Sequence, residues 1–111
     1  MEPAKMDPEL KARWVAALRS GRYKQGIGAL CYVGNSGERR FCCLGVLADI
    51  AVEGDWIPHD MLLRKAQTGN GSLGNHDALL GNPKAQDELI YKNDTEQADF
   101  NQIADYIAAN L

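Results

Sequence analysis

The chain has 111 residues, of which 45% are hydrophobic and 24% charged, and its net charge is −3. This size and composition predict one ordinary globular domain with a single core. They argue against a membrane-spanning protein, because the longest apolar run is too short to cross a bilayer, and against a bulk nucleic-acid binder, which would be basic overall. Because the N-terminus lacks the regions of a signal peptide, we expect a cytoplasmic protein.

The charge is unevenly distributed along the chain. Residues 1–40 hold eight Lys or Arg and four Asp or Glu, for a charge of +4, whereas residues 41–111 hold four and eleven, for −7. Such an asymmetry can orient a partner during encounter, or it can belong to two segments that pack together. Both interpretations stay open at this level.

The first predicted element is an amphipathic helix. Asp7 is placed to cap it, Pro8 suits its first position, and Gly21 is placed to end it in a left-handed turn. One face of this helix carries the apolar residues Leu10, Trp14, Ala17 and Leu18. After an irregular segment over residues 22–26, a hairpin is expected, with strands at residues 27–33 and 39–41 around a turn at 34–37.

The dominant feature is the apolar run from Phe41 to Ala51, which Asp49 alone interrupts. Its length and periodicity predict a central buried helix over residues 42–52, in which Gly45 lets another backbone approach closely. The residues at helical spacing are Cys43, Leu44, Leu47, Ile50 and Ala51. We expect this helix to lie between the N-terminal helix and a C-terminal helix.

The C-terminal half predicts three further helices. A short one covers Pro58 to Arg64, and residues 68–75 form a glycine-rich mobile loop. The next opens at Asn82-Pro83, buries Leu89 and Ile90, and is broken at residues 93–95. The last has Asp99 and Gln102 at capping-box spacing, followed by the apolar stripe Phe100, Ile103, Ala104, Ile107, Ala108 and Leu111. The predicted fold is therefore a mainly α-helical α+β single domain over residues 1–111, with a central buried helix and a small β-hairpin.

The three cysteines are interpreted as buried, reduced thiols. The count is odd and Cys42 and Cys43 are adjacent, so a disulfide framework is disfavoured. The catalytic alternative pairs Cys42 or Cys31 with His59 or His76 as the base. The spacing of these residues does not match a zinc site, and the glycine pattern at residues 69–74 lacks the surrounding βαβ unit of a dinucleotide site. We therefore predict no metal and no cofactor.

A basic cluster is the best candidate for a binding surface. If the hairpin returns beside the first helix, cationic side chains from both converge, which suits phosphate, carboxylate or an acidic protein surface. The cluster, with one aromatic residue that could stack on a ligand, comprises Arg19, Arg22, Tyr23, Lys24, Gln25, Arg39 and Arg40. The opposite interpretation is a solvated charged edge. Acidic residues of the C-terminal third serve as helix caps and solvated faces, or as a face for a basic partner.

Four segments carry a family resemblance. They are Trp14–Gly26, Phe41–Asp49, Asn93-Asp94 and Phe100–Ile107. The chain resembles small uncharacterised proteins of tailed bacteriophages and prophages over about two-thirds of its length; residues 54–81 do not match. The resemblance implies a phage accessory protein in the host bacterial cytoplasm.

Small phage proteins of this kind commonly bind a host component, and inhibition of an antiviral defence system is one such role. We therefore expect a non-enzymatic protein that binds a host protein or complex. The alternatives are a pocket that sequesters a small anionic ligand such as a signalling nucleotide, with Tyr23 or Trp56 stacking on a base, and a cysteine-dependent enzyme.

Overall fold

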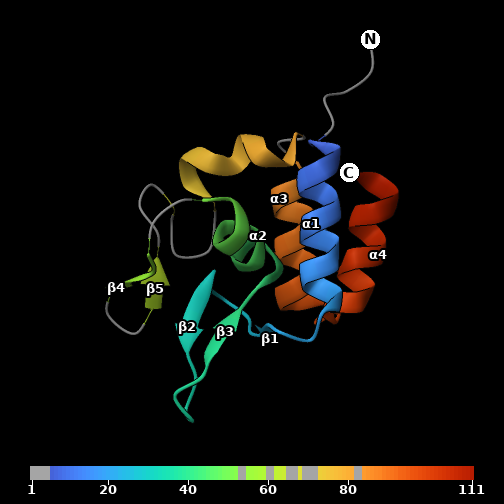
Figure 1. Cartoon of the computed structure of the whole chain (residues 1–111). Helices are drawn as coiled ribbons and strands as arrows, with labels where there is room; N and C mark the ends of the chain where they lie inside the picture. Colours follow the sequence, from blue (N-terminus) through green and yellow to red (C-terminus); the bar gives the residue numbers. More distant parts are fainter. Residues whose placement is uncertain (1–5, 53–54, 60–61, 65–67, 69–72, 82–83) are drawn as a thin grey trace.

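The computed structural model describes residues 6–52, 55–59, 62–64, 68, 73–81 and 84–111 (Figure 1). Helices pack on a small sheet, so the α+β class predicted from the sequence is confirmed. The N-terminal elements are α1 (Pro8–Arg19), β1 (Lys24–Gln25), β2 (Cys31–Val33), β3 (Arg39–Phe41) and α2 (Cys43–Ala51). They are followed by β4 (Ile57–His59), β5 (Leu62–Arg64), a 3₁₀ helix (Gly74–Leu80), α3 (Ala85–Ile90), a π-helix (Tyr91–Thr95) and α4 (Phe100–Asn110).

Helix α1 begins and ends where its sequence predicts. The Asp7 carboxylate accepts a hydrogen bond from the Leu10 backbone N–H at 2.9 Å, and Gly21 follows the helix with a φ of +76°. Trp14 and Leu18 are buried on the predicted face. Local capping and periodicity are therefore sufficient to define this element.

The predicted hairpin is present, and the sheet around it is larger than expected. Strands β2 and β3 pair antiparallel, but β2 starts at Cys31, and Ile27 is 47% exposed. The segment predicted to be irregular contains β1, which pairs parallel with β3. A two-residue strand is too short to show a sequence period, and its pairing depends on a segment about fifteen residues away.

The helix predicted over residues 58–64 is wrong. Strands β4 and β5 pair antiparallel there, and β5 pairs with β2, which gives the strand order β1-β3-β2-β5-β4. Pro58 lies in β4 at the sheet edge, where a residue without a backbone N–H is tolerated. The segment takes its conformation from pairing with distant residues rather than from its own pattern.

Helix α2 is the central buried helix that the sequence predicts. Its residues from Cys43 to Ala48 are all buried, and Ile50 and Ala51 are half-buried. A Cβ on Gly45 would lie 1.8 Å from the Leu30 carbonyl oxygen, so the predicted close backbone approach is confirmed.

The predicted position of α2 between the two terminal helices needs correction. The main contacts of α2 are with α1 and α3, whereas α4 packs mainly against α1 (Figure 1). On one side of α2 the Trp14 indole N–H donates to the Cys43 carbonyl oxygen at 2.9 Å, and on the other the Cys43 thiol donates to the Leu89 carbonyl oxygen. The predicted packing omitted α3, which buries Leu89 against α2.

The C-terminal segments combine confirmed and corrected predictions. Helix α3 buries Leu89 but does not break at residues 93–95; it continues as the π-helix, in which Asn93 is fully buried. The capping box of Asp99 and Gln102 is present at the start of α4. The α4 stripe is buried except for Ala108.

Two predictions fall partly outside the described residues. The predicted helix start at Asn82-Pro83 lies outside them, as does most of the glycine-rich loop. At the end of that loop, Leu73 is fully buried and Gly74 begins the 3₁₀ helix. Within the described segments, no helix has the length and apolar content needed to cross a membrane.

Candidate functional site

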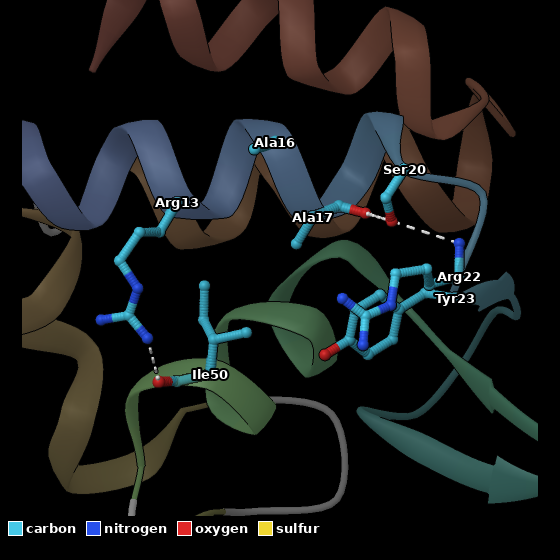
Figure 2. Close-up of a pocket in the computed structure, with 7 residues that line it drawn as sticks. All are labelled: Arg13, Ala16, Ala17, Ser20, Arg22, Tyr23 and Ile50. Atoms are coloured by element: carbon cyan, nitrogen blue, oxygen red, sulfur yellow. Dashed lines mark hydrogen bonds between the residues drawn. The ribbon is translucent and has the colours of Figure 1, made fainter.

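An open groove lies between α1 and α2 (Figure 2). Its volume is about 510 Å³, and we call it the Arg13–Arg22 groove. It is lined by Arg13, Ala16, Ala17, Ser20, Arg22, Tyr23 and Ile50. Because Ala16 and Ala17 are small, they leave space beside Ile50 of α2, and the floor of the groove is apolar.

Two arginines lie on either side of this apolar floor. In the view of Figure 2, Ile50 lies between Arg13 and Arg22. The Arg13 guanidinium donates to the Ile50 carbonyl oxygen at 3.2 Å, which holds it across the space between the helices. Among the described residues, the Arg22 guanidinium has no hydrogen-bond partner, so its donors face solvent. The arrangement offers two positive charges, of which that of Arg13 is held by the fold, to a ligand with anionic groups at both ends.

The position of Arg22 depends on the end of α1. The Ser20 hydroxyl donates to the Ala17 carbonyl oxygen at 2.6 Å and accepts from the Arg22 backbone N–H at 3.2 Å. Gly21, with its positive φ, turns the chain between them. The turn that terminates the helix therefore places Arg22 at the end of the groove.

Tyr23 lines the groove but is held by the fold. Its hydroxyl donates to an Asp49 carboxylate oxygen at 2.6 Å, and its ring packs edge-on against Phe41 at 5.0 Å. Burial, followed by the hydrogen bond to Asp49, raises the pKa of Tyr23 to about 12. Trp56 donates to the other Asp49 oxygen at 2.9 Å and is only 8% exposed. Trp56 is therefore not available to stack on a base, whereas Tyr23 is held in place at the side of the groove.

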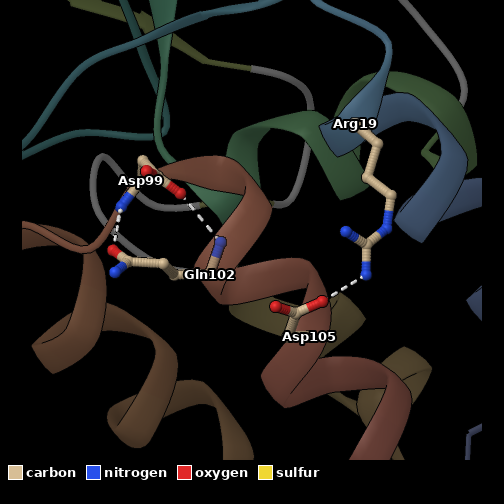
Figure 3. Close-up of polar contacts among 4 residues, drawn as sticks. All are labelled: Arg19, Asp99, Gln102 and Asp105. Carbon is tan, nitrogen blue, oxygen red and sulfur yellow. Dashed lines mark hydrogen bonds and ion pairs between the residues drawn. The ribbon is translucent and has the colours of Figure 1, made fainter.

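The other members of the predicted basic cluster do not converge on the groove. Arg19 forms an ion pair with Asp105 of α4 (Figure 3). Arg40 binds Glu38 at 3.0 Å and the Gln25 carbonyl oxygen at 3.1 Å. These contacts tie elements of the fold together, so the guanidinium groups of Arg19 and Arg40 are engaged within the chain.

Gln25 is a structural residue. Its side-chain amide donates to Asn93 at 2.9 Å and to the Ala98 carbonyl oxygen at 2.7 Å. Lys24 and Arg39 are exposed on strands β1 and β3. They do not line the groove, and the predicted cluster is thus divided among several regions.

The sequence interpretation missed Arg13, although a signal was present. Arg13, Ala16, Ala17 and Ser20 follow the spacing i, i+3, i+4 and i+7, which places them on one face of a helix. That face adjoins the one carrying Trp14 and Leu18, and Ala17 lies on the border between them. Small side chains on one face of a helix, next to an arginine, leave a groove when a second helix packs beside that face. The sequence alone does not show which helix packs there.

The comparison with protein families gives one match. The model of a domain of unknown function, DUF8296, matches residues 6–68, more than half of the chain. The chain belongs to this family. The comparisons with curated proteins and with solved structures gave no match.

The DUF8296 region contains the whole groove. The matched residues run from the start of α1 through β5, so both helices of the groove and the turn before β1 lie within it. A second open hollow, lined by Lys84, Asp87, Glu88, Tyr91 and Glu96, lies on α3 and the π-helix outside this region. The charged residues that line the Arg13–Arg22 groove are basic, whereas those that line this hollow are mostly acidic. The hollows thus follow the charge difference between the two parts of the sequence.

The three cysteines are free and buried. Burial raises the pKa of Cys31 to about 11 and that of Cys42 to about 12, and it raises the pKa of Cys43 well above its ordinary value. A thiol nucleophile needs a lowered pKa and partial exposure, so all three are in unfavourable surroundings for catalysis. Within the described part of the chain, no group of three or more His, Cys, Asp or Glu is placed to hold a metal.

Proposed function

We propose that this protein is a non-enzymatic binding protein that captures another protein through the Arg13–Arg22 groove. The observation that carries the proposal is the pair of guanidinium groups on either side of an apolar, solvent-open floor. Charged groups at a rim with apolar contacts between them are typical of surfaces that recognise protein segments. Arg22 and Tyr23 are the members of the predicted basic cluster that line this site.

Two observations favour protein binding over the alternatives. Trp56 is buried, so one of the two rings that the nucleotide alternative offers for stacking is not available, and the other, Tyr23, is held by Asp49 and Phe41. The raised pKa values of the buried thiols disfavour a cysteine-dependent enzyme.

The proposed context is a bacterial host. The resemblance to small proteins of tailed phages supports a phage-encoded accessory protein that acts in the host cytoplasm on a host protein or complex. Inhibition of an antiviral defence system is the role we propose for that capture. It rests on the association of such proteins with this role.

The test is capture of a defined partner by matched variants. The tagged chain is incubated with bacterial lysate, the captured protein is identified and purified, and its Kd is measured. We expect Arg13→Glu and Arg22→Glu each to weaken binding by about tenfold or more, because each reverses an exposed charge at the interface. Arg22→Glu should melt within about 2 °C of the original chain, since surface substitutions rarely change stability by more than about 0.5 kcal/mol. Arg13→Glu also loses the hydrogen bond to the Ile50 carbonyl oxygen, so its stability should fall by about 1 kcal/mol and its melting temperature by about 4 °C.

The control is Arg39→Glu, which makes the same charge change on β3 away from the groove. If Arg39→Glu weakens capture as much as Arg22→Glu, net charge rather than the groove governs binding. If a nucleotide raises the melting temperature by several degrees and Arg22→Glu removes that shift, the ligand is small and the protein-binding proposal fails.

A further inference from the structure

We infer that the Arg13–Arg22 groove recognises an extended protein segment in which an aliphatic residue lies between two acidic residues. This inference rests on the proposed function and specifies the chemistry of the partner. It is derived from the two positive ends of the groove, its apolar floor and its short length.

The length of the groove follows from the geometry of α1. Arg13 and Arg19 are six residues apart, which corresponds to about 9 Å along a helix axis, and Arg22 lies three residues further on. The two arginines thus lie at the ends of a segment that rises along α1 and then turns at Gly21, and we take a spacing of about 10–13 Å between the anionic groups of the partner as part of the inference. In an extended segment, side chains at i and i+4 point to the same side and lie about 13 Å apart.

The floor of the groove defines the central residue. Ala16, Ala17 and Ile50 form an apolar surface between the two arginines. In an extended segment the side chain at i+2 points to the same side as those at i and i+4. An aliphatic side chain at i+2 would therefore cover Ile50 while the flanking carboxylates reach the guanidinium groups.

The order of groups along the groove suits an extended segment. The hydrogen bond from Arg13 to the Ile50 carbonyl oxygen connects α1 to α2 at one end, and the turn containing Ser20 and Arg22 lies at the other. In an extended segment the side chains at i, i+2 and i+4 follow one another on the same side, which matches the order of cation, apolar floor and cation in the groove.

The inference is tested by fluorescence anisotropy with the full chain and a labelled peptide in which Glu, Leu and Glu alternate with Ser. We expect saturable binding that weakens about tenfold when both Glu residues are replaced by Gln, and that weakens as salt is raised from 50 to 300 mM. Replacing the central Leu by Ser should also weaken binding several-fold.

Protein variants locate the binding site. Arg13→Gln and Arg22→Gln should each weaken peptide binding, and Arg39→Gln should not. Ala16→Glu places a negative charge on the exposed floor and should abolish binding. Ala109→Glu makes the same change on the exposed surface of α4 and is its matched control.

The outcomes separate this inference from the proposed function. If the peptide does not bind saturably while groove-dependent capture of the full partner persists, the acidic–aliphatic–acidic inference is overturned and the proposed function stands. Equal binding of the Glu and Gln peptides overturns it as well. If ATP binds in place of the peptide and requires Arg13 and Arg22, both proposals are overturned.

Discussion

Gly45 is the position at which the structure makes its sharpest prediction about stability. It lies in the first turn of α2, and a Cβ there would be 1.8 Å from the Leu30 carbonyl oxygen and 2.7 Å from the Leu30 carbonyl carbon. Both obstructing atoms belong to the backbone, so no side-chain rotation can relieve the contact. We therefore expect Gly45→Ala to destabilise the fold.

The magnitude follows from opposing effects. In an unobstructed helix, replacing Gly by Ala stabilises by about 1 kcal/mol. Here the two backbones must separate by at least 1.2 Å to bring the 1.8 Å contact to 3.0 Å. Overpacking of this kind costs about 1–3 kcal/mol or more. The separation also breaks the hydrogen bond from the Cys42 N–H to the Leu30 carbonyl oxygen, and its loss adds about 1 kcal/mol to the destabilisation.

The expected net loss in the free energy of unfolding is about 3 kcal/mol, because the rigid obstruction places the overpacking cost at the upper end of its range. For a chain of this size, a loss of 1 kcal/mol lowers the melting temperature by about 4 °C, so a decrease of about 12 °C is expected. Thermal and urea unfolding followed by circular dichroism measure both quantities.

Gly28→Ala is the control for this substitution. Gly28 has a φ of +82° and open space around its Cα, so an added methyl group meets no atom within 4 Å. The cost there is only that of the left-handed conformation, about 1–2 kcal/mol. If Gly45→Ala is as stable as the original chain, or less destabilising than Gly28→Ala, the close approach of α2 to Leu30 is refuted.

Three further predictions concern buried polar groups. Asn93→Ala should lower the free energy of unfolding, measured in urea, by about 2–3 kcal/mol, because it leaves the buried partners of Asn93 without a hydrogen bond. The control Asn101→Ala, at an exposed position, should lower it by less than about 0.5 kcal/mol, and equal losses would contradict the Asn93 contacts. At pH 8, iodoacetamide should alkylate the native chain far more slowly than the unfolded chain, since burial raises the pKa of Cys31 to about 11; rapid native labelling would contradict this. The pKa of Tyr23 rises from 10.0 to about 12 on folding, so the folded chain keeps the phenol proton to higher pH than the unfolded chain. The contribution of Tyr23 to the free energy of unfolding should therefore be complete below pH 10 and decline from pH 10 to 12, and Tyr23→Phe should remove that decline.

The elements that the sequence predicts correctly are those with local signals. The Asp7 cap of α1, the capping box of α4 and the apolar period of α2 act within a few residues of the chain. The hairpin of β2 and β3 likewise has its turn residues between its strands. In these segments propensity, periodicity and packing agree, so the sequence alone is sufficient.

The elements predicted wrongly obtain their conformation from distant partners. Strand β5 pairs with β2, about thirty residues earlier, and β1 pairs with β3, about fifteen residues later, with β2 between them in the sequence. Each strand has only two or three residues, which is too few for an alternation of side chains to be recognised. The helical pattern over Pro58 to Arg64 was therefore outweighed by backbone pairing.

The candidate site shows the same division between local and distant information. A sequence reveals where cations occur, but the acceptors that engage them lie far along the chain: Asp105 for Arg19, and Asn93 for Gln25. Asn93 also donates to the Gly26 carbonyl oxygen, and the π-helix places its amide between β1 and α2. Arg22 lacks such an acceptor among the described residues and also lines the groove, so its charge is available to the ligand that we propose. The sequence therefore predicts that a candidate binding surface is basic, but the position of that surface depends on the fold.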